Sequence, residues 1–318
     1  MEILDVDLIG FETGDRTRRR AVVDGVMRSL ATGFVYLAHD LSEDLLDACY
    51  AQLAEFFELP FEDKRRSESP GSRGQSGYTG LLVETAAAHA HADWKEMLNW
   101  GASLAEGHPL AAAFPDRYLE PVFPETEFPG ISQRLMKFHR AVAELQRRFL
   151  RIVAEGLGAR ADFFDAMVEQ GATLTRAVHY PRMADAPGHE HVWAAEHGDI
   201  NLVTALPRAT APGLQVRTDA GWVDAAPPLG HAVLNSGLML EHFSNGLLPT
   251  GIHRVVARPG QTEDRLSVVQ FCHPTPDTTL SPLPSCITTE RPRCFESITA
   301  ADRLDTVLRE IGLSEGAP

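Results

Sequence analysis

Two histidines and one aspartate in the second half of the chain have the types and spacing of metal ligands. His197 and Asp199 are two positions apart, and residues i and i+2 of an extended strand point to the same face. Gly198 adds no side chain between them. His253 follows much later, in a second segment with the composition of a strand. The pattern therefore predicts an imidazole beside a carboxylate, with another imidazole supplied by a different strand.

Two imidazoles and one carboxylate form the facial triad that holds iron in non-haem Fe(II) oxygenases. Such a set leaves coordination positions open for substrate and O2. Zinc is the main rival by ligand type, although a catalytic zinc ion usually keeps a single open position. A zinc hydrolase would also need a general base near the metal, and the sequence offers no obvious one there.

The His-x-Asp pair is a weak signal by itself. About one such pair is expected by chance at this composition, and His91-Ala92-Asp93 is a second example. That pair lies in an Ala-rich segment, with no second histidine at a suitable distance among the expected strands. A lone His197 would more often be a structural histidine, so its interpretation depends on its neighbours.

The residues Arg265-Leu266-Ser267 place an arginine and a serine on one face of an expected strand. The planar guanidinium of arginine binds a carboxylate with two hydrogen bonds, and serine adds a hydroxyl. The pair is therefore a candidate site for a dicarboxylate co-substrate near the metal. The alternative is that Arg265 forms a surface salt bridge after the turn at residues 260–264.

Helices are expected in the first half of the chain and strands in the second. Apolar residues at helical spacing predict helices over residues 16–30, 41–57 and 130–157, with Ser42 as an N-cap, whereas Gly33–Leu37 has the composition of a strand. After about residue 172, short apolar runs alternate with Pro and Gly turns, which is typical of a β-sandwich or barrel. These runs are Leu174–Tyr180, Asn201–Leu206, Leu214–Arg217, Ala232–Asn235, His253–Ala257 and Leu266–Phe271.

Three further segments complete the expected organisation. Residues 66–80, which are rich in Ser, Gly and Arg, are expected to form a loop. The long helix over 130–157 is expected to end at Gly156 and Gly158 and to pack on the barrel as its outer support. Residues 300–311 are expected to form a closing helix.

Composition and charge exclude several classes of protein. Of the 318 residues, 44% are hydrophobic and 23% are charged, as in ordinary globular proteins. The net charge of −15 argues against nucleic acid or an anionic membrane surface as the main partner. The cysteines lack CxxC spacing, no secretory signal precedes them, and no apolar run approaches the roughly 20 residues of a membrane helix. We therefore expect a reduced, cytoplasmic protein that is a monomer or a weak dimer.

Short motifs extend along almost the whole chain. In the first third they are Gly33–Asp40, Phe56–Pro60, Glu62–Lys64, Gly77-Tyr78 and Asp93–Glu96. In the second half they are Tyr180-Pro181, His197–Leu206, Gly213–Val216, Gly221–Val223, Ser244–Val255 and Arg265–Ser267. In this order they resemble the 2-oxoglutarate- and Fe(II)-dependent dioxygenases of the isopenicillin N synthase type. Each motif is modest, but the ordered set is specific.

The resemblance implies a mainly β fold with flanking α-helices and a double-stranded β-helix, or jelly-roll, core. It implies one oxygenase domain over residues 1–318. Within that domain, an N-terminal α/β region would cover residues 1–120, and the jelly-roll core over 170–280 would carry the metal site.

The resemblance also implies roles for individual residues. The triad of His197, Asp199 and His253 would hold Fe(II). Arg265 and Ser267 would bind the far carboxylate of 2-oxoglutarate, which the family's equivalent of Tyr180 commonly touches. O2 would be the second co-substrate, with ascorbate only as a supporting reductant. The carboxylate position that a halogenase of this type leaves vacant for halide is filled here.

The expected activity is hydroxylation, desaturation or cyclisation of a small organic molecule. The preference for Arg over Lys is typical of GC-rich bacterial genomes, and together with the family it suggests bacterial specialised metabolism. One alternative is an Fe(II) oxidase of the same fold that uses no 2-oxoglutarate, since isopenicillin N synthase keeps the Arg-x-Ser pair for its substrate. A more remote alternative is a non-catalytic binding protein, which loss of a triad residue would have favoured.

Two departures from the family pattern are expected to change the shape of the pocket. Val178 stands where the family has Asn, and Leu238 stands where it has Asp. Three extra histidines, His189, His191 and His273, are not expected to bind the metal.

Overall fold

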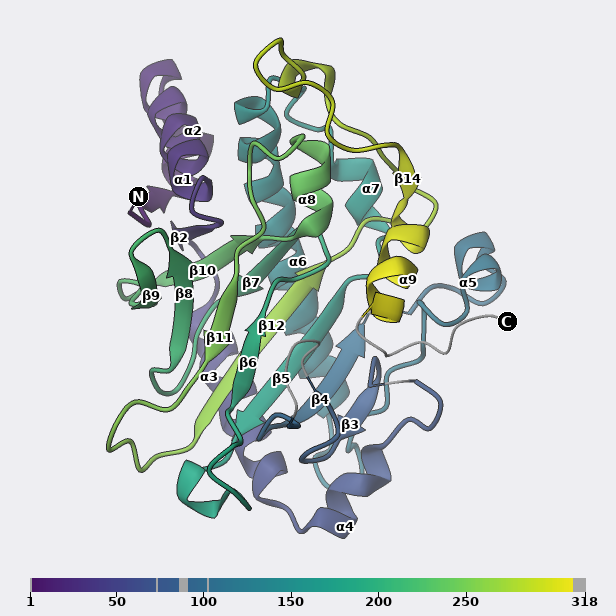
Figure 1. The fold of residues 1–318 in the computed structure, drawn as a ribbon. Helices are drawn as coiled ribbons and strands as arrows, with labels where there is room; N and C mark the ends of the chain where they lie inside the picture. Colours follow the sequence, from purple (N-terminus) through teal and green to yellow (C-terminus); the bar gives the residue numbers. More distant parts are fainter. Residues whose placement is uncertain (1, 73, 86–90, 102, 311–318) are drawn as a thin grey trace.

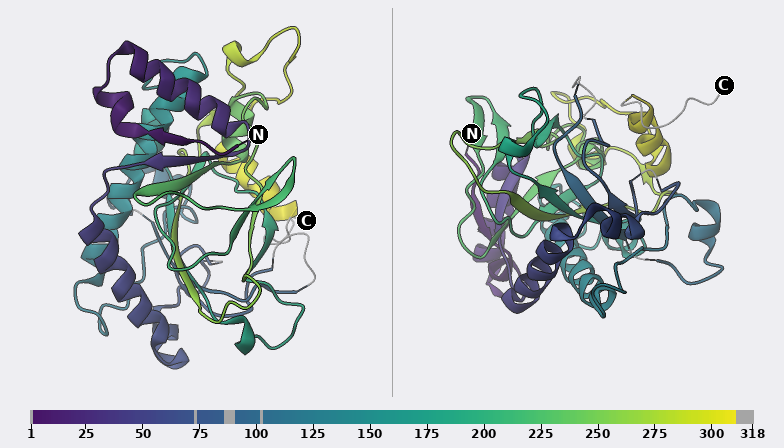
Figure 2. Two further views of the ribbon diagram at one scale, coloured as in Figure 1. Left: turned by 90° about the vertical axis from the view of Figure 1, so that its left-hand side faces the viewer. Right: turned by 90° about the horizontal axis from the view of Figure 1, so that it is seen from below.

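Two mostly antiparallel β-sheets of unequal size face each other, and helices cover the outer face of the larger sheet (Figures 1 and 2). This architecture comes from a computed structural model, which describes residues 2–72, 74–85, 91–101 and 103–310. It confirms the expected fold class, a β core with flanking helices.

The larger sheet combines four strands of the expected core with four strands that precede it in the chain. Within the described residues its order is β1 (Asp5–Asp7), β2 (Phe34–Ala38), β10 (His231–Ser236), β7 (Val203–Leu206), β12 (Arg265–Cys272), β5 (Leu174–Tyr180), β4 (Glu96–Gly101) and β3 (Gly77–Thr79). The smaller sheet has the order β6 (Ala194–His197), β11 (His253–Val255), β8 (Leu214–Thr218) and β9 (Gly221–Asp224). A short pair, β13 (Thr279–Leu280) and β14 (Ile298–Thr299), lies apart from both.

The chain passes back and forth between the two sheets from β5 to β12. Strands β5, β7, β10 and β12 belong to the larger sheet, whereas β6, β8 and β11 belong to the smaller one. This alternation is the winding of a double-stranded β-helix. It brings the inner faces of seven strands around one interior space, where side chains at alternate positions can meet.

The helix α6 (Ile131–Gly156) supports the larger sheet from outside (Figure 1). Its apolar residues recur at spacings of three and four, so they form one buried stripe against β7 and β12. Gln146 in this stripe donates hydrogen bonds to the carbonyls of Val203 and Gln270, at 3.1 and 2.9 Å. These bonds fix the helix to the two central strands. Gly158, with a φ of +74°, adopts the left-handed conformation that commonly follows a helix end.

Two more long helices, α2 (Arg16–Leu30) and α3 (Glu43–Glu58), flank α6. Ser42 caps α3 by accepting a hydrogen bond from the backbone N–H of Leu45, as expected. The remaining α-helices are α1 (Leu8–Thr13), α4 (Phe61–Lys64), α5 (Pro109–Ala113), α7 (Asp165–Glu169), α8 (Leu238–Phe243) and α9 (Ala300–Glu310). Short 3-10 turns lie at Arg65–Ser67, Met183–Asp185 and Pro284–Cys286.

The structure corrects several expected boundaries. The expected loop over 66–80 contains strand β3, because Gly77–Thr79 pairs with β4. The run expected from Asn201 begins as a strand only at Val203, and the run expected to reach Ala257 ends at Val255. The closing helix is observed up to Glu310, and Ile311 lies outside the described residues.

All four cysteines are unpaired, as expected. Among the described residues, no helix is long and apolar enough to cross a membrane.

Candidate metal centre

Pairing of two strands in the smaller sheet brings the two candidate histidines together. Strands β6 and β11 are antiparallel, and His197 lies directly opposite His253, with ring centroids 4.3 Å apart. Asp199 lies two residues beyond the end of β6. One ligand atom from each of the three residues lies within 4.8 Å of the others. Within the described ranges, no other group of three or more His, Cys, Asp or Glu residues has this geometry.

Backbone carbonyls fix the tautomers of both rings. The Nδ1 of His197 lies 2.8 Å from the carbonyl of Ala195, and the Nδ1 of His253 lies 3.0 Å from the carbonyl of Gly251. A carbonyl oxygen can only accept, so each Nδ1 carries the proton and donates it. The lone pair of each Nε2 is therefore free for a metal, in the arrangement common to metal-binding histidines.

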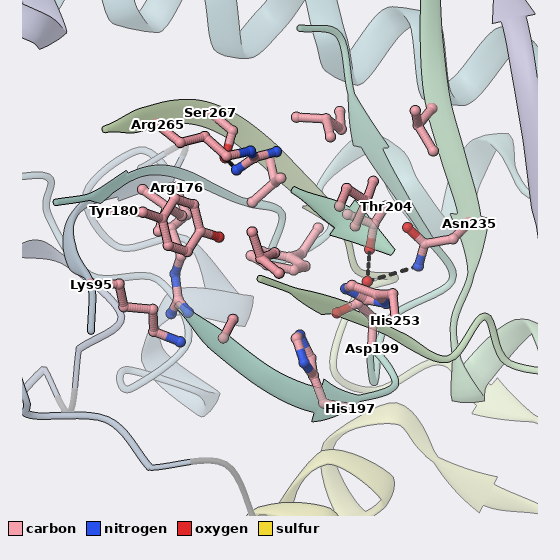
Figure 3. Close-up of a pocket in the computed structure, with 18 of the residues that line it drawn as sticks. Lys95, Arg176, Tyr180, His197, Asp199, Thr204, Asn235, His253, Arg265 and Ser267 are labelled. Carbon is pink, nitrogen blue, oxygen red and sulfur yellow. Dashed lines mark hydrogen bonds between the residues drawn. The ribbon is translucent and has the colours of Figure 1, made fainter. Parts of the chain in front are cut away.

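Two neighbours hold one oxygen of the Asp199 carboxylate. The hydroxyl of Thr204 and the amide nitrogen of Asn235 donate to Oδ2, at 2.6 and 2.8 Å (Figure 3). Burial alone would raise the pKa of Asp199, but the nearby His253 and His197 and these hydrogen bonds outweigh it, so the pKa is below its usual range. Asp199 is therefore ionised, with its Oδ1 left for another interaction.

His197 is in the protonation state that a metal requires. Although one edge of His197 is open to solvent, desolvation by the surrounding protein lowers its pKa to about 4, and the neighbouring His253 contributes in the same direction. A neutral imidazole is a ligand, whereas an imidazolium ion is not.

A second polar group lies further along the interior of the barrel. Arg265 and Tyr180 are directly opposite each other on β12 and β5, and the guanidinium carbon lies 5.1 Å from the centre of the tyrosine ring. Arg265 donates from Nη1 to the hydroxyl of Ser267 at 2.8 Å and from Nε to the carbonyl of Ala211 at 3.2 Å. The expected Arg-x-Ser pair thus shares one face of β12.

Arg265 is not a surface residue, which contradicts the salt-bridge alternative. It is only 2% exposed, and among the described residues no carboxylate lies within ion-pair distance of it. Burial lowers its pKa from the ordinary value for arginine. A buried cation without a counter-ion is costly, so the site favours an anionic ligand.

The triad and Arg265 line the same cavity between the two sheets (Figure 3). The atom-free space between its walls is about 660 Å3, part of which opens to solvent. Most other lining side chains are apolar, including Val178 at the position where the family has a polar Asn. The triad and Arg265 therefore border one shared space that has an apolar wall beside it.

Several residues that shape this site were not expected from the sequence. Thr204 lies in one of the quoted motifs and Asn235 ends an expected strand, but their contacts with Asp199 were not foreseen. Both could have been found from strand alternation, since each lies on the inner face of its strand. Lys95 and Arg176 also line the cavity and were not assigned. Asp93, in the discounted His-x-Asp pair, accepts a hydrogen bond from the backbone of Ala195 and so anchors β6.

The turn after β10 packs closely on the backbone that follows Asp199. Leu238 donates its backbone N–H to the carbonyl of Asp199 at 2.9 Å. A side chain at Gly237 would collide with the backbone oxygen of Asn201. The replacement of the family's Asp by Leu238 therefore leaves the backbone support of Asp199 in place. None of the extra histidines, His189, His191 and His273, belongs to the triad's group.

Two family models match different parts of the sequence. Residues 172–274 match the model of the 2OG-Fe(II) oxygenase superfamily, and residues 4–123 match the model described as the N-terminal region of non-haem dioxygenases in morphine synthesis. The first match contains the triad and Arg265, and the second contains β1 to β4.

Individual relatives are similar along nearly the entire chain. A 2OG-Fe(II) oxygenase family protein from Caulobacter crescentus has a crystal structure with 32% identity and a TM-score of 0.85, covering 97% of this chain and 99% of that one. A full-length Neurospora crassa protein, crystallised in complex with alpha-KG and thymine, has 26% identity and a TM-score of 0.84, with 98% and 97% covered. Mugineic-acid 3-dioxygenase of Hordeum vulgare is 28% identical over 306 residues, which are 94% of this chain and 82% of that protein.

Proposed function

Because this chain belongs to the 2OG-Fe(II) oxygenase superfamily, we propose that it oxidises a small organic molecule at an Fe(II) ion held by His197, Asp199 and His253. Proteins of this family use Fe(II), 2-oxoglutarate and O2, so the chain is a 2-oxoglutarate- and Fe(II)-dependent dioxygenase. One observation carries the assignment of residues: a single cavity is lined by the triad and by a buried arginine without a carboxylate partner among the described residues.

The donor set fits Fe(II). Two imidazoles each offer Nε2, and one ionised carboxylate offers Oδ1. This is the ligand set of the facial triad, which leaves positions for a chelating co-substrate and O2. When bound, Fe(II) and 2-oxoglutarate supply the activation of O2 for oxidation of a C–H bond.

The protein's own residues bind and orient the reactants. Arg265 is proposed to pair with the far carboxylate of 2-oxoglutarate, with Ser267 and Tyr180 beside it. Thr204 and Asn235 keep the free oxygen of Asp199 directed away from them and toward the histidines. The apolar walls exclude water around these charges, which strengthens each interaction.

The type of oxidation and the metabolic role of the enzyme are also proposed. We propose hydroxylation, desaturation or cyclisation of a small molecule in bacterial specialised metabolism. The relative from Caulobacter crescentus supports a bacterial setting, and the barley relative, which is named for mugineic acid, supports a small organic molecule as substrate. A monomer or weak dimer in the cytoplasm, with free thiols, completes the proposal.

We further propose that residues 1–318 act as one domain. The strands β1 to β4, which lie within residues 1–120, extend the same sheet as β5, β7, β10 and β12 of the region 170–280. The whole chain would then unfold in one cooperative transition. Two separate transitions in calorimetry would contradict this part of the proposal.

The function is tested by measuring succinate released from 2-oxoglutarate with Fe(II), ascorbate and air, without added substrate, against a His197→Ala control. Slow succinate release that depends on iron and on His197 is the expected result. If none appears, anaerobic titration of the Fe(II) protein with 2-oxoglutarate decides the matter. Binding there would mean strict coupling to substrate, and absence of binding would favour an oxidase that never uses 2-oxoglutarate.

A further inference from the structure

The proposed function assigns no role to two cations on the cavity wall. The polar residues of the wall include the triad with Thr204 and Asn235, and the group formed by Arg265, Ser267 and Tyr180. Among the described residues of the wall, the remaining charged side chains are Lys95 and Arg176. Arg176 lies on β5, and Lys95 immediately precedes the neighbouring strand β4. Figure 3 shows their charged ends close together on the side of His197.

Arg176 makes a short hydrogen bond through Nε, whereas its two terminal nitrogens make only long contacts with the described residues. Its Nε donates to the side-chain oxygen of Asn99 at 2.7 Å, which is a short and well-made bond. Among the described residues, its two terminal nitrogens have only long contacts, 3.4 Å to Glu84 and 3.4 Å to the carbonyl of Gly74. These distances exceed the usual range for N–H···O bonds. Arg176 therefore keeps donors available for a ligand while its position is fixed.

The carboxylates that pair with these cations, Glu84 and Asp93, are not among the residues that line the cavity. Lys95 contacts Asp93 at 2.8 Å and Glu84 at 3.2 Å, and Arg176 shares the same Glu84. Burial would raise the pKa of Glu84, but Arg176 and Lys95 lower it below its usual range. Glu84 thus stays ionised beside Arg176 and Lys95. Among the described residues, the charged side chains that line the cavity at this point are therefore both positive.

The ring of Phe271 provides an apolar surface beside Arg176. The guanidinium carbon of Arg176 lies 5.5 Å from the centre of the Phe271 ring. Phe271 is paired in register with Thr204, the residue that holds Asp199. A ligand anchored at Arg176 would therefore place an apolar body over Phe271 and extend toward the proposed metal.

We propose that the prime substrate is a carboxylic acid whose carboxylate is bound by Arg176 and Lys95 and whose apolar part lies against Phe271. This inference rests on the proposed function, because it assumes that Arg265 is taken by 2-oxoglutarate. Arg176 is the main anchor, since its two terminal nitrogens can bind both oxygens of a carboxylate. Lys95 adds a point charge beside it.

The test uses the full-length protein loaded with Mn(II), which does not turn over, and saturated with 2-oxoglutarate. The probes are benzoate and hexanoate, each compared with its primary amide. Proton relaxation of a probe by Mn(II) reports its binding next to the triad. The acids are expected to bind more tightly than the matched amides. Arg176→Gln is expected to weaken binding of the acids by about 10-fold to 100-fold, with partial recovery in Arg176→Lys.

Matched controls separate this inference from misfolding and from failure of the proposed function. Arg182→Gln removes an exposed arginine two residues beyond Tyr180 and should leave probe binding unchanged. If Arg176→Gln does not fold, Lys95→Met serves as the second variant, with a smaller expected loss. Amides that bind as well as the acids, acids that bind equally to Arg176→Gln, or no binding of any probe would overturn the inference. Failure of 2-oxoglutarate itself to bind would instead overturn the proposed function.

Discussion

Replacing Arg265 with methionine should separate the stability of the ligand-free protein from its response to 2-oxoglutarate. Arg265 is 2% exposed and makes two polar contacts, to Ser267 and to the carbonyl of Ala211. Methionine has a similar length and removes a buried cation, which offsets the loss of those contacts. We therefore expect the free energy of unfolding without ligand to change by no more than about 1 kcal/mol, whereas truncation of a well-packed core residue costs about 2–5 kcal/mol.

Unlike the stability of the ligand-free protein, the stabilisation by 2-oxoglutarate should change strongly in Arg265→Met. Two hydrogen bonds to a charged group contribute about 3 kcal/mol or more, so the affinity of the variant should fall about 100-fold or more. At a concentration of about 100 times its Kd, a ligand stabilises the native protein by about 2.7 kcal/mol. For a chain of this size that corresponds to a rise in Tm of roughly 5 °C. The wild type should show this rise, and Arg265→Met at the same concentration should show almost none.

The assay is thermal unfolding of the Mn(II)-loaded proteins in an anaerobic titration with 2-oxoglutarate. Arg182→Met, at an exposed arginine, is the matched control and should respond like the wild type. An undiminished rise in Tm for Arg265→Met would refute the role of this residue. A large loss of stability in its ligand-free form would refute the view that its charge is uncompensated.

Three further perturbations follow from the structure. Asn235→Ala removes one of the two donors to Asp199, so Fe(II) affinity should fall about 10-fold to 100-fold in a metal titration; unchanged affinity would mean that Asn235 does not orient the carboxylate. Burial lowers the pKa of His139 to about 4, below the value of about 6.5 in the unfolded state. Between these two pH values the unfolded state binds more protons than the native state. The free energy of unfolding therefore falls as the pH drops from about 6.5 to about 4. The loss from this residue reaches at most about 3 kcal/mol, and urea unfolding at pH 7 and pH 5 should show a smaller difference in His139→Gln than in the wild type. Gly237→Ala should destabilise by about 3 kcal/mol because the new Cβ meets a backbone oxygen that cannot move aside, whereas Gly80→Ala, where a Cβ has ordinary contacts, should melt near the wild type.

The sequence predicted the long elements well, because their signals are local. The helix α6 was expected over 130–157 and is observed over Ile131–Gly156, since its apolar stripe repeats many times. Strand β5 was expected with the bounds that it has, because Pro181 and the polar residues around it mark its ends. In both cases, one element's own composition decides its structure.

Elements that depend on distant partners were harder to predict. Strand β3 has three residues and exists because β4 lies beside it, so nothing in Gly77–Thr79 alone distinguishes it from a loop. The site showed the same limit. The two-residue spacing predicted that His197 and Asp199 are neighbours, but the support from Thr204 and Asn235 depends on which strands face each other. The isolation of Arg265 from any carboxylate among the described residues is likewise a property of the packed barrel and not of its sequence neighbours.

The position of His197 on β6 has a mechanical consequence. Within the described residues, β6 is the outer strand of the smaller sheet and pairs only with β11. The register of that pairing shifts between His253 and Val255, so the strand is held by few regular hydrogen bonds. A metal shared by His197 and His253 would act as a cross-link between these two strands and close the chain between them into a loop. Metal loading would thus be coupled to the integrity of this edge of the barrel, and backbone amides of β6 should exchange with solvent more slowly when the metal is bound.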